Sequence, residues 1–218
     1  MHIPKRPLGR TGEEVTVLGL GGEGVLRTFG RDEEAYRVIR AAWEAGVRYF
    51  ESARAYSGSE AYLGRGLQGI REQIFLTSKS HGRSRAEAEE HLHLTLKNMQ
   101  TDHLDLWQVH DIRTIQEVEA LGAPGGALEA FYRAKEQGKT RFVGVTGHHD
   151  PAILRLALEK YDFDTVLLPI NPAEPHHASF LPLAQEAAAR GVGVVGMTVL
   201  CRGVLPQLYE DSLPLFGD

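Results

Sequence analysis

The sequence contains little cysteine, no excess of positive charge and no long apolar run, and each shortage excludes a class of protein. Cys201 is the only cysteine among the 218 residues, which excludes an internal disulfide framework and suits a reducing compartment. No segment approaches the roughly 18 continuous apolar residues of a membrane span, and the amino-terminal stretch lacks the apolar core of a secretory signal. We therefore expect a cytoplasmic protein without a membrane partner.

The charge balance is slightly acidic. Lys and Arg number 24 against 29 Asp and Glu, which gives a formal net charge of -5. Because binding to nucleic acid requires a concentrated basic face, and the sequence shows none, we expect no nucleic-acid partner. Hydrophobic residues make up 42% of the chain, and no linker or low-complexity tract divides it. These features predict a single globular domain over residues 1–218.

Apolar runs rich in β-branched residues alternate with segments of helical periodicity along the chain. Seven runs predict strands, at residues 15–20, 48–51, 74–78, 104–109, 141–145, 165–168 and 192–197. Six amphipathic segments predict helices, at residues 32–45, 59–68, 85–99, 126–136, 151–160 and 181–190. A regular alternation of strand and helix requires parallel strands joined by right-handed crossovers, so the predicted fold class is α/β.

This alternation leaves a choice between a barrel and an open doubly wound sheet. An open sheet that binds a dinucleotide carries G-x-G-x-x-G directly after its first strand, whereas residues 19–24 read G-L-G-G-E-G and lack that spacing. We therefore predict a (β/α)8 barrel of the TIM type. It is expected to be incomplete, because such barrels need about 250 residues and only seven strands are recognisable. Residues 7–12 predict a hairpin turn against the barrel floor.

Polar side chains follow three of the predicted strands, at the barrel face where catalytic groups lie. Tyr56 can act as a general acid if a nearby cation lowers the pKa of its phenol from the usual value of about 10. Lys79 can supply that cation, and Glu51 can hold its ammonium group. His110 can donate a hydrogen bond to a carbonyl oxygen on which negative charge develops. Each of these residues alone also has an ordinary structural role, so the chemistry depends on their combination.

The order of these residues resembles the aldo-keto reductase family. Glu51 opens a carboxylate-S-A-x-x-Y motif that ends at Tyr56, and a strand-end lysine and a strand-end histidine follow. Further similar segments are residues 6–22, 101–110, 138–145 and 191–197. The resemblance implies a barrel that binds NADP(H), less often NAD(H), and transfers hydride to a small aldehyde or ketone, with the tyrosine as acid.

Several positions depart from the family pattern. Glu51 stands where the family has aspartate, so its contact with Lys79 must differ in geometry. The family's G-x-S-N after the fifth strand is replaced by a stretch that offers Thr146, with His148 as a substitute donor. Asn171 is the amide nearest to the family's glutamine, and Met197 takes the place of its stacking aromatic. The resemblance implies the following cofactor contacts, with weak binding expected: Gly22, Thr146, Gly147, His148, Asn171, Met197, Thr198, Val199 and Leu200.

The carboxyl-terminal stretch is the largest departure. Residues 198–205 resemble the family's loop and glycine turn, but only residues 206–218 follow. They contain no counterpart of the eighth strand or of the helix start that binds the cofactor's 2′-phosphate and adenine. Truncation, a naturally short chain and completion by a partner all stay open. Unpaired strand edges at the gap predict a homo-oligomer.

Two alternatives to a working reductase also stay open. The first is a non-catalytic or cofactor-impaired binding protein, which Glu51 and the missing strand favour and the retained tyrosine, lysine and histidine oppose. The second is a metal-dependent barrel hydrolase or isomerase. It is suggested by the histidines and carboxylates near the strand ends, namely His81, His110, His148, His149, His176, His177, Asp111 and Asp150, although no metal ligand set is assigned. The sequence identifies neither the substrate nor the preference between NADP and NAD.

Overall fold

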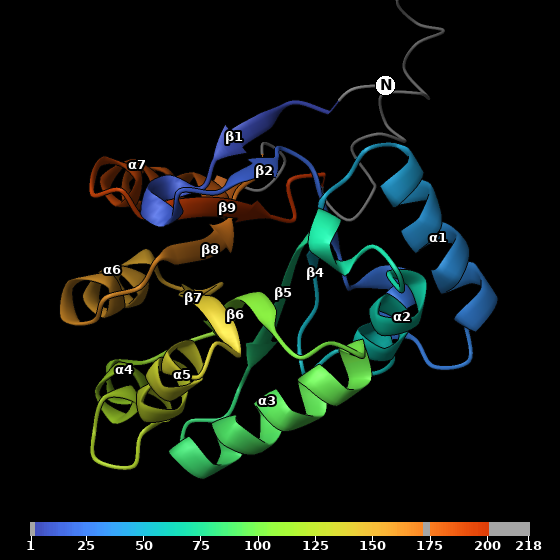
Figure 1. Cartoon of the computed structure of the whole chain (residues 1–218). Helices are drawn as coiled ribbons and strands as arrows, with labels where there is room; N and C mark the ends of the chain where they lie inside the picture. Colours follow the sequence, from blue (N-terminus) through green and yellow to red (C-terminus); the bar gives the residue numbers. More distant parts are fainter. Residues whose placement is uncertain (1–2, 172–174, 201–218) are drawn as a thin grey trace, which may run out of the picture.

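The structure, a computed structural model, describes residues 3–171 and 175–200. Its centre is a curled sheet of seven parallel strands in the order β3 to β9, each paired with its neighbours in sequence (Figure 1). The strands are β3 (Gly19–Gly21), β4 (Tyr49–Glu51), β5 (Phe75–Ser80), β6 (Leu104–Val109), β7 (Thr140–Thr146), β8 (Thr165–Pro169) and β9 (Gly193–Met197). The predicted α/β fold class with seven parallel strands is confirmed.

Seven helices among the described residues surround the sheet on its outer side (Figure 1). They are α1 (Asp32–Glu44), α2 (Ser59–Gly66), α3 (Arg85–Met99), α4 (Ile115–Leu121), α5 (Ala127–Glu136), α6 (Pro151–Lys160) and α7 (Leu181–Ala189). Of these, α4 was not predicted from the sequence, and it begins with a capping box between Thr114 and Glu117. No helix in the described part of the chain is long and apolar enough to cross a membrane.

The predicted first strand, residues 15–20, is two strands in the structure. β2 (Glu14–Thr16) pairs antiparallel with β1 (Lys5–Pro7), and only β3 joins the parallel sheet. The chain changes partner between them, where Val17 and Leu18 are about half exposed. The β1–β2 hairpin packs against the barrel floor, as predicted, because Leu8 and Val15 contact the inward-facing rings of Tyr49 and Phe75.

Alternate side chains of each strand face opposite sides of the sheet, which creates two apolar layers. The outer layer packs the sheet against the helices, and in it Trp107 stacks on Phe131 of α5 with ring centroids 3.7 Å apart. The inner layer is smaller and surrounds Leu106. Polar side chains at the strand ends continue the inward-facing set, so the interior becomes polar toward the carboxyl ends of the strands.

The sheet is open between its first and last strands. β3 pairs with β4 and β9 pairs with β8, and within residues 3–171 and 175–200 no strand joins β3 to β9. The incomplete barrel is therefore confirmed for the described residues. Cys201 and residues 202–205, part of the predicted glycine turn, lie outside them.

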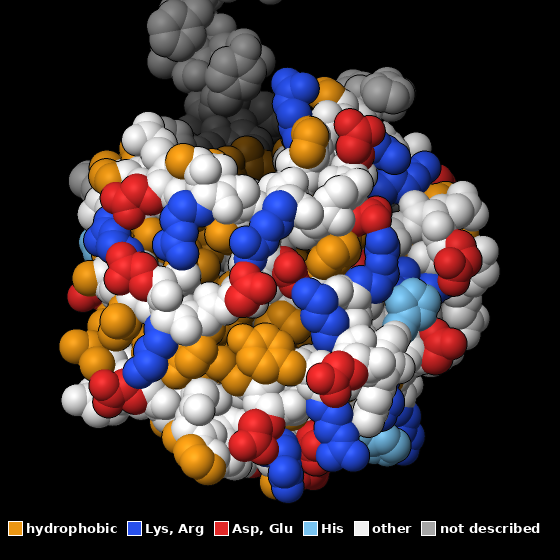
Figure 2. Space-filling model, turned by 60° about the vertical axis from the view of Figure 1, so that its left-hand side comes forward, with side chains coloured by type: hydrophobic (Ala, Val, Ile, Leu, Met, Phe, Trp, Pro, Cys, Tyr) orange, Lys and Arg blue, Asp and Glu red, His pale blue; other side chains and the backbone are white. Residues whose placement is uncertain are grey.

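The surface carries charges of both signs close together. Figure 2 shows one face on which basic and acidic side chains alternate around a cluster of apolar ones. Several of the exposed charges form ion pairs, such as Arg155 with Glu186 at 2.7 Å. Exposed pairs of this kind contribute little to stability, about 0 to 1 kcal/mol each.

Candidate active site

The structure places Lys79 and Glu51 in direct contact. Lys79 lies on β5 with 1% of its side chain exposed, and its Nζ donates hydrogen bonds to Glu51 Oε1 at 2.7 Å and to the Ser52 carbonyl oxygen at 2.8 Å. Glu51 Oε2 is buried and has no hydrogen-bond partner among the described residues. Glutamate therefore makes the lysine contact that the resemblance assigns to aspartate, and it holds a second oxygen without a partner.

Tyr56 lies between the lysine and the histidine. Lys79 Nζ is 5.1 Å from the centroid of the Tyr56 ring, and the His110 ring meets it edge-on with centroids 5.8 Å apart. Three residues from separate strand ends therefore come together as expected. The electrostatic expectation is not met in this state, because burial and the charge of Glu51 raise the pKa of Tyr56 well above its usual value of 10. The proton is thus held firmly on the phenol.

His110 is nearly buried and is neutral at physiological pH. Burial, followed by the charge of Lys79, lowers the pKa of His110 to about 3. Its backbone N–H donates to the Ser80 carbonyl, and Arg83 Nη2 donates to its carbonyl oxygen at 2.9 Å. The next residue, Asp111, has φ of 52°, a left-handed conformation that costs a non-glycine residue free energy and often occurs at functional sites. A neutral imidazole can donate one hydrogen bond to a substrate oxygen.

The low pKa of His110 predicts a dependence of stability on pH. Between about pH 6.5 and pH 3 the unfolded chain binds a proton at this imidazole that the folded chain does not. The contribution of His110 to the free energy of unfolding is therefore complete above pH 6.5 and falls as the pH falls. In His110→Gln this protonation is absent. We therefore expect the free energy of unfolding to fall less with decreasing pH, by on the order of several kcal/mol at the low-pH end of this range. Urea unfolding at a series of pH values measures this, and identical slopes in both proteins would contradict it.

A buried carboxylate anchors the segment that carries Tyr56. Glu60, near the start of α2, is 1% exposed and links that segment to β5 and α3. It accepts hydrogen bonds from Arg54 Nη1 at 2.8 Å, Ser78 Oγ at 2.9 Å, Thr95 Oγ1 at 2.6 Å and Asn98 Nδ2 at 3.1 Å. Glu60 was not predicted from the sequence, although its neighbours in α2 are buried. This network fixes the backbone immediately after Tyr56.

The residues predicted to contact a cofactor fall into two groups. Gly22 follows β3, and a Cβ atom there would lie 2.2 Å from Ser59 Oγ, so its role in the structure is close packing. The others lie at or just after the carboxyl ends of β7, β8 and β9, at the same edge of the sheet. Thr146 Oγ1 accepts a hydrogen bond from the Asp111 N–H at 2.8 Å, and burial lowers the pKa of the neighbouring His148.

Further along this edge the side chains become more exposed. Gly147 and Asn171 are buried, Met197 and Thr198 are partly buried, and Val199 and Leu200 are about half exposed. Thr198 has a left-handed backbone with φ of 58°, and its hydroxyl donates to the Met197 carbonyl at 2.7 Å. The edge thus combines hydrogen-bonding groups on β7 and β8 with an apolar surface after β9.

Several of the histidines lie in pairs. His81 lies against His91 with ring centroids 4.4 Å apart, and His148 and His149 are 6.2 Å apart. In the described part of the chain, no group of three or more His, Cys, Asp or Glu side chains is placed to hold a metal ion. The geometry therefore gives the hydrolase or isomerase hypothesis no ligand set.

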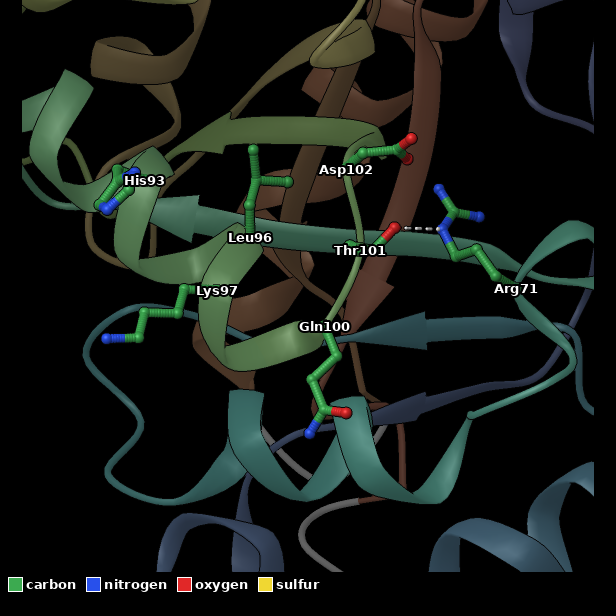
Figure 3. Close-up of a pocket in the computed structure, with 7 residues that line it drawn as sticks. All are labelled: Arg71, His93, Leu96, Lys97, Gln100, Thr101 and Asp102. Atoms are coloured by element: carbon green, nitrogen blue, oxygen red, sulfur yellow. Dashed lines mark hydrogen bonds between the residues drawn. The ribbon is translucent and has the colours of Figure 1, made fainter.

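Two hollows lie away from these strand ends. One, of about 650 Å³, is on the outer side of α3 and is lined by Arg71, His93, Leu96, Lys97, Gln100, Thr101 and Asp102 (Figure 3). The other, of about 460 Å³, is at the floor, where Arg71 and Arg141 each contact buried Asp105 at 2.8 Å. Neither includes a predicted site residue, so the candidate site is defined by the strand ends.

Known proteins resemble this chain in both sequence and fold. The family model described as "Aldo/keto reductase family" matches residues 17–218. L-galactose dehydrogenase of Arabidopsis thaliana is 26% identical over 227 residues, which cover 94% of this chain and 68% of that protein. The holo form of an aldo-keto reductase from Bacillus halodurans matches with a TM-score of 0.79 and 28% identity, over 94% of this chain and 69% of that one.

A solved aldo-keto reductase from Klebsiella pneumoniae, in complex with NADPH, shares the fold with a TM-score of 0.74 at 21% identity. The match covers 88% of this chain and 67% of that one. The chain thus spans about two thirds of the length of these three proteins. Because the family match extends over most of the sequence and the sheet follows the same architecture, this chain belongs to the aldo/keto reductase family of oxidoreductases.

Proposed function

We propose that the chain reduces an aldehyde or ketone to an alcohol with NADP(H), or less often NAD(H), and that Tyr56 is the general acid. The observation that carries the proposal is the placement of the Tyr56 ring 5.1 Å from Lys79 Nζ and edge-on to the neutral His110. Family membership supports a nicotinamide cofactor, as does the NADPH bound to the Klebsiella pneumoniae reductase.

The residues at the edge of β7 to β9 fit the nicotinamide end of such a cofactor. Thr146, His148 and Asn171 carry hydroxyl, imidazole and amide groups that suit a carboxamide. Met197 is partly exposed and presents a polarizable surface to a planar ring. When bound, the cofactor supplies hydride to the carbonyl carbon. Because these donors differ from the family's own set, we propose weak cofactor binding.

In the proposed reaction, residues of the chain stabilise and then neutralise the negative charge on the carbonyl oxygen. His110 donates a hydrogen bond to this oxygen as negative charge builds up during hydride addition. Tyr56 transfers its hydroxyl proton to the oxygen, which completes the alcohol and leaves a tyrosinate that solvent reprotonates. Burial and the nearby carboxylates raise the pKa of Tyr56, so the phenol carries its proton before the reaction and needs a nearby cation to release it. Lys79, held by Glu51, keeps a positive charge beside the developing tyrosinate.

Titration with NADPH tests the proposal directly. We expect the cofactor to quench the fluorescence of the two tryptophans and seven tyrosines with saturation below about millimolar concentration. The complex should then reduce a reactive aldehyde such as a nitrobenzaldehyde, which is followed by the loss of NADPH absorbance. Absence of quenching up to millimolar NADPH and NADH would contradict a reductase. Binding without turnover would favour the cofactor-impaired binding protein, which the unpartnered Glu51 oxygen also favours.

Three broader assignments complete the proposal. We propose that the chain acts in the cytoplasm, which its single cysteine supports. We also propose that residues 1–218 form one domain, since one large core cluster connects helices α1 to α7 with the sheet. Third, we propose that copies associate through the edges of β3 and β9, which pair with no further strand among the described residues. Such edges favour pairing with another chain.

A further inference from the structure

A second cation faces Tyr56 from a loop that was not predicted to belong to the site. Arg27 closes the short helix η2 (Gly24–Arg27), which follows β3, and its guanidinium carbon lies 5.2 Å from the centroid of the Tyr56 ring. Its Nη1 donates to Glu23 Oε1 at 2.9 Å, and 52% of its side chain is exposed. The acid is therefore flanked by a buried cation, Lys79, and an exposed one.

The two cations differ in how strongly they are neutralised. Lys79 is buried and directly paired with Glu51 at 2.7 Å, so much of its field at Tyr56 is cancelled by a fixed neighbour. Arg27 is paired with Glu23 in an exposed position, where ion pairs contribute little and separate readily. Arg27 is thus the cation whose contribution at Tyr56 can change with its partner.

Six charged or titratable groups face Tyr56 from the surrounding elements. They are Glu51 from β4, Lys79 from β5, His110 and Asp111 from the end of β6, and Glu23 and Arg27 from the β3–α1 loop. After burial, the carboxylates of Glu51 and Glu23 raise the pKa of Tyr56 most, Asp111 raises it less, and Arg27 lowers it. Two side chains four residues apart on one loop therefore act on the same phenol with opposite sign.

We propose that Arg27 is a positioning residue for the acid: held over the Tyr56 ring, its charge stabilises the tyrosinate left by proton donation, and Glu23 opposes it. This deepens the proposed function, on which it rests. Arg27 acts through Tyr56 and needs no contact with the substrate. The acid strength of Tyr56 then depends on the charges of Arg27 and Glu23 in the β3–α1 loop as well as on the residues at the strand ends.

The test measures the ionisation of residue 56 without relying on turnover. A fluorinated tyrosine at position 56 has a lower intrinsic pKa, which brings its ionisation into a range where the fold survives, and ultraviolet absorbance follows it. We expect Arg27→Gln to raise this pKa by about half a pH unit and Glu23→Gln to lower it by a similar amount. These pKa shifts correspond to about a two- to five-fold change in the ionisation constant of residue 56. A change of this size matches the free energy of an exposed cation–π contact.

Arg31 provides the matched control. It lies on the same loop, its side chain is also 52% exposed and it pairs with Glu34, yet it does not face Tyr56. Arg31→Gln should leave the ionisation unchanged, and Arg27→Lys should retain most of the effect. Shifts of the same sign in the Arg27 and Glu23 variants, or no difference from Arg31→Gln, would overturn the proposal. If the shifts appear in a protein that does not reduce aldehydes, the electrostatic role stands and the reductase assignment fails.

Discussion

Replacing Tyr56 by phenylalanine is expected to lower the turnover of a reactive aldehyde by about 10²- to 10⁴-fold, the usual contribution of a positioned general acid. The Tyr56 ring contacts both Lys79 and His110 at the strand ends, and phenylalanine preserves this ring but carries no proton to donate. The dissociation constant for NADPH should change little, because the ring still fills its place. Steady-state kinetics and fluorescence titration of the same preparation measure both quantities.

The control for this variant is Tyr161→Phe. The Tyr161 hydroxyl donates to the Val118 carbonyl at 2.9 Å between α6 and α4, away from the strand ends. Its loss should lower the free energy of unfolding by about 0.5 to 1.5 kcal/mol and leave turnover unchanged. Equal turnover in Tyr56→Phe and the parent protein would show that Tyr56 is not the acid.

Lys79→Met is expected to destabilise the fold by about 3 to 5 kcal/mol, because it leaves a carboxylate in the protein interior without its counter-ion. Glu51 would then have neither oxygen paired among the described residues, since Oε2 already has no hydrogen-bond partner and Oε1 would lose the ammonium group at 2.7 Å. The Ser52 carbonyl would lose a donor as well. Urea unfolding followed by far-ultraviolet circular dichroism measures the loss.

A double variant separates the charge effect from a loss of packing. Lys79→Met combined with Glu51→Gln removes both charges and should recover a large part of the stability lost in Lys79→Met, because the unpaired carboxylate is gone. Turnover should stay low in both proteins. Two results would contradict this explanation: a Lys79→Met protein as stable as the parent, or a double variant no more stable than the single one. Either would show that the ion pair with Lys79 does not offset the cost of burying the Glu51 carboxylate.

The arrangement of the reaction centre was predictable because parallel strands place their carboxyl ends at one edge. The strand ends singled out Tyr56, Lys79 and His110 as candidates, and their order on successive strands indicated one shared site. The sequence predicted one strand at residues 15–20 where the structure has two, and the reason lies in the local sequence. β-branched and apolar residues run through this segment without a glycine or proline break until Gly19, so a change of pairing partner left no signal.

Electrostatic properties were the least predictable part of the site. A lysine beside a tyrosine suggested a lowered pKa, but burial of the phenol and the nearby carboxylates act in the opposite direction. Both effects depend on distances that separate segments establish only after folding. Arg27 and Glu60 were missed for a related reason. Arg27 lies outside every predicted helix and strand, Glu60 looks like one more charged residue of a predicted helix, and only the fold turns one toward Tyr56 and buries the other.

The anchoring of Tyr56 by Glu60 has a consequence for how such a protein can be modified. Glu60, four residues after Tyr56, accepts four hydrogen bonds that link its segment to β5 and α3, and neither Arg27 nor Glu23 takes part in them. Leu26 of the β3–α1 loop is buried and Thr28 and Arg31 hydrogen-bond to Tyr62 of α2, so the loop as a whole belongs to the packed structure. Glu23 and Arg27 are exposed, and on the proposed function we expect charge changes at these two positions to alter the acidity of Tyr56 while that packing is kept. If Tyr56 is the acid, these two exposed positions offer a way to change the pH dependence of the reaction while the buried side chains at the strand ends stay in place.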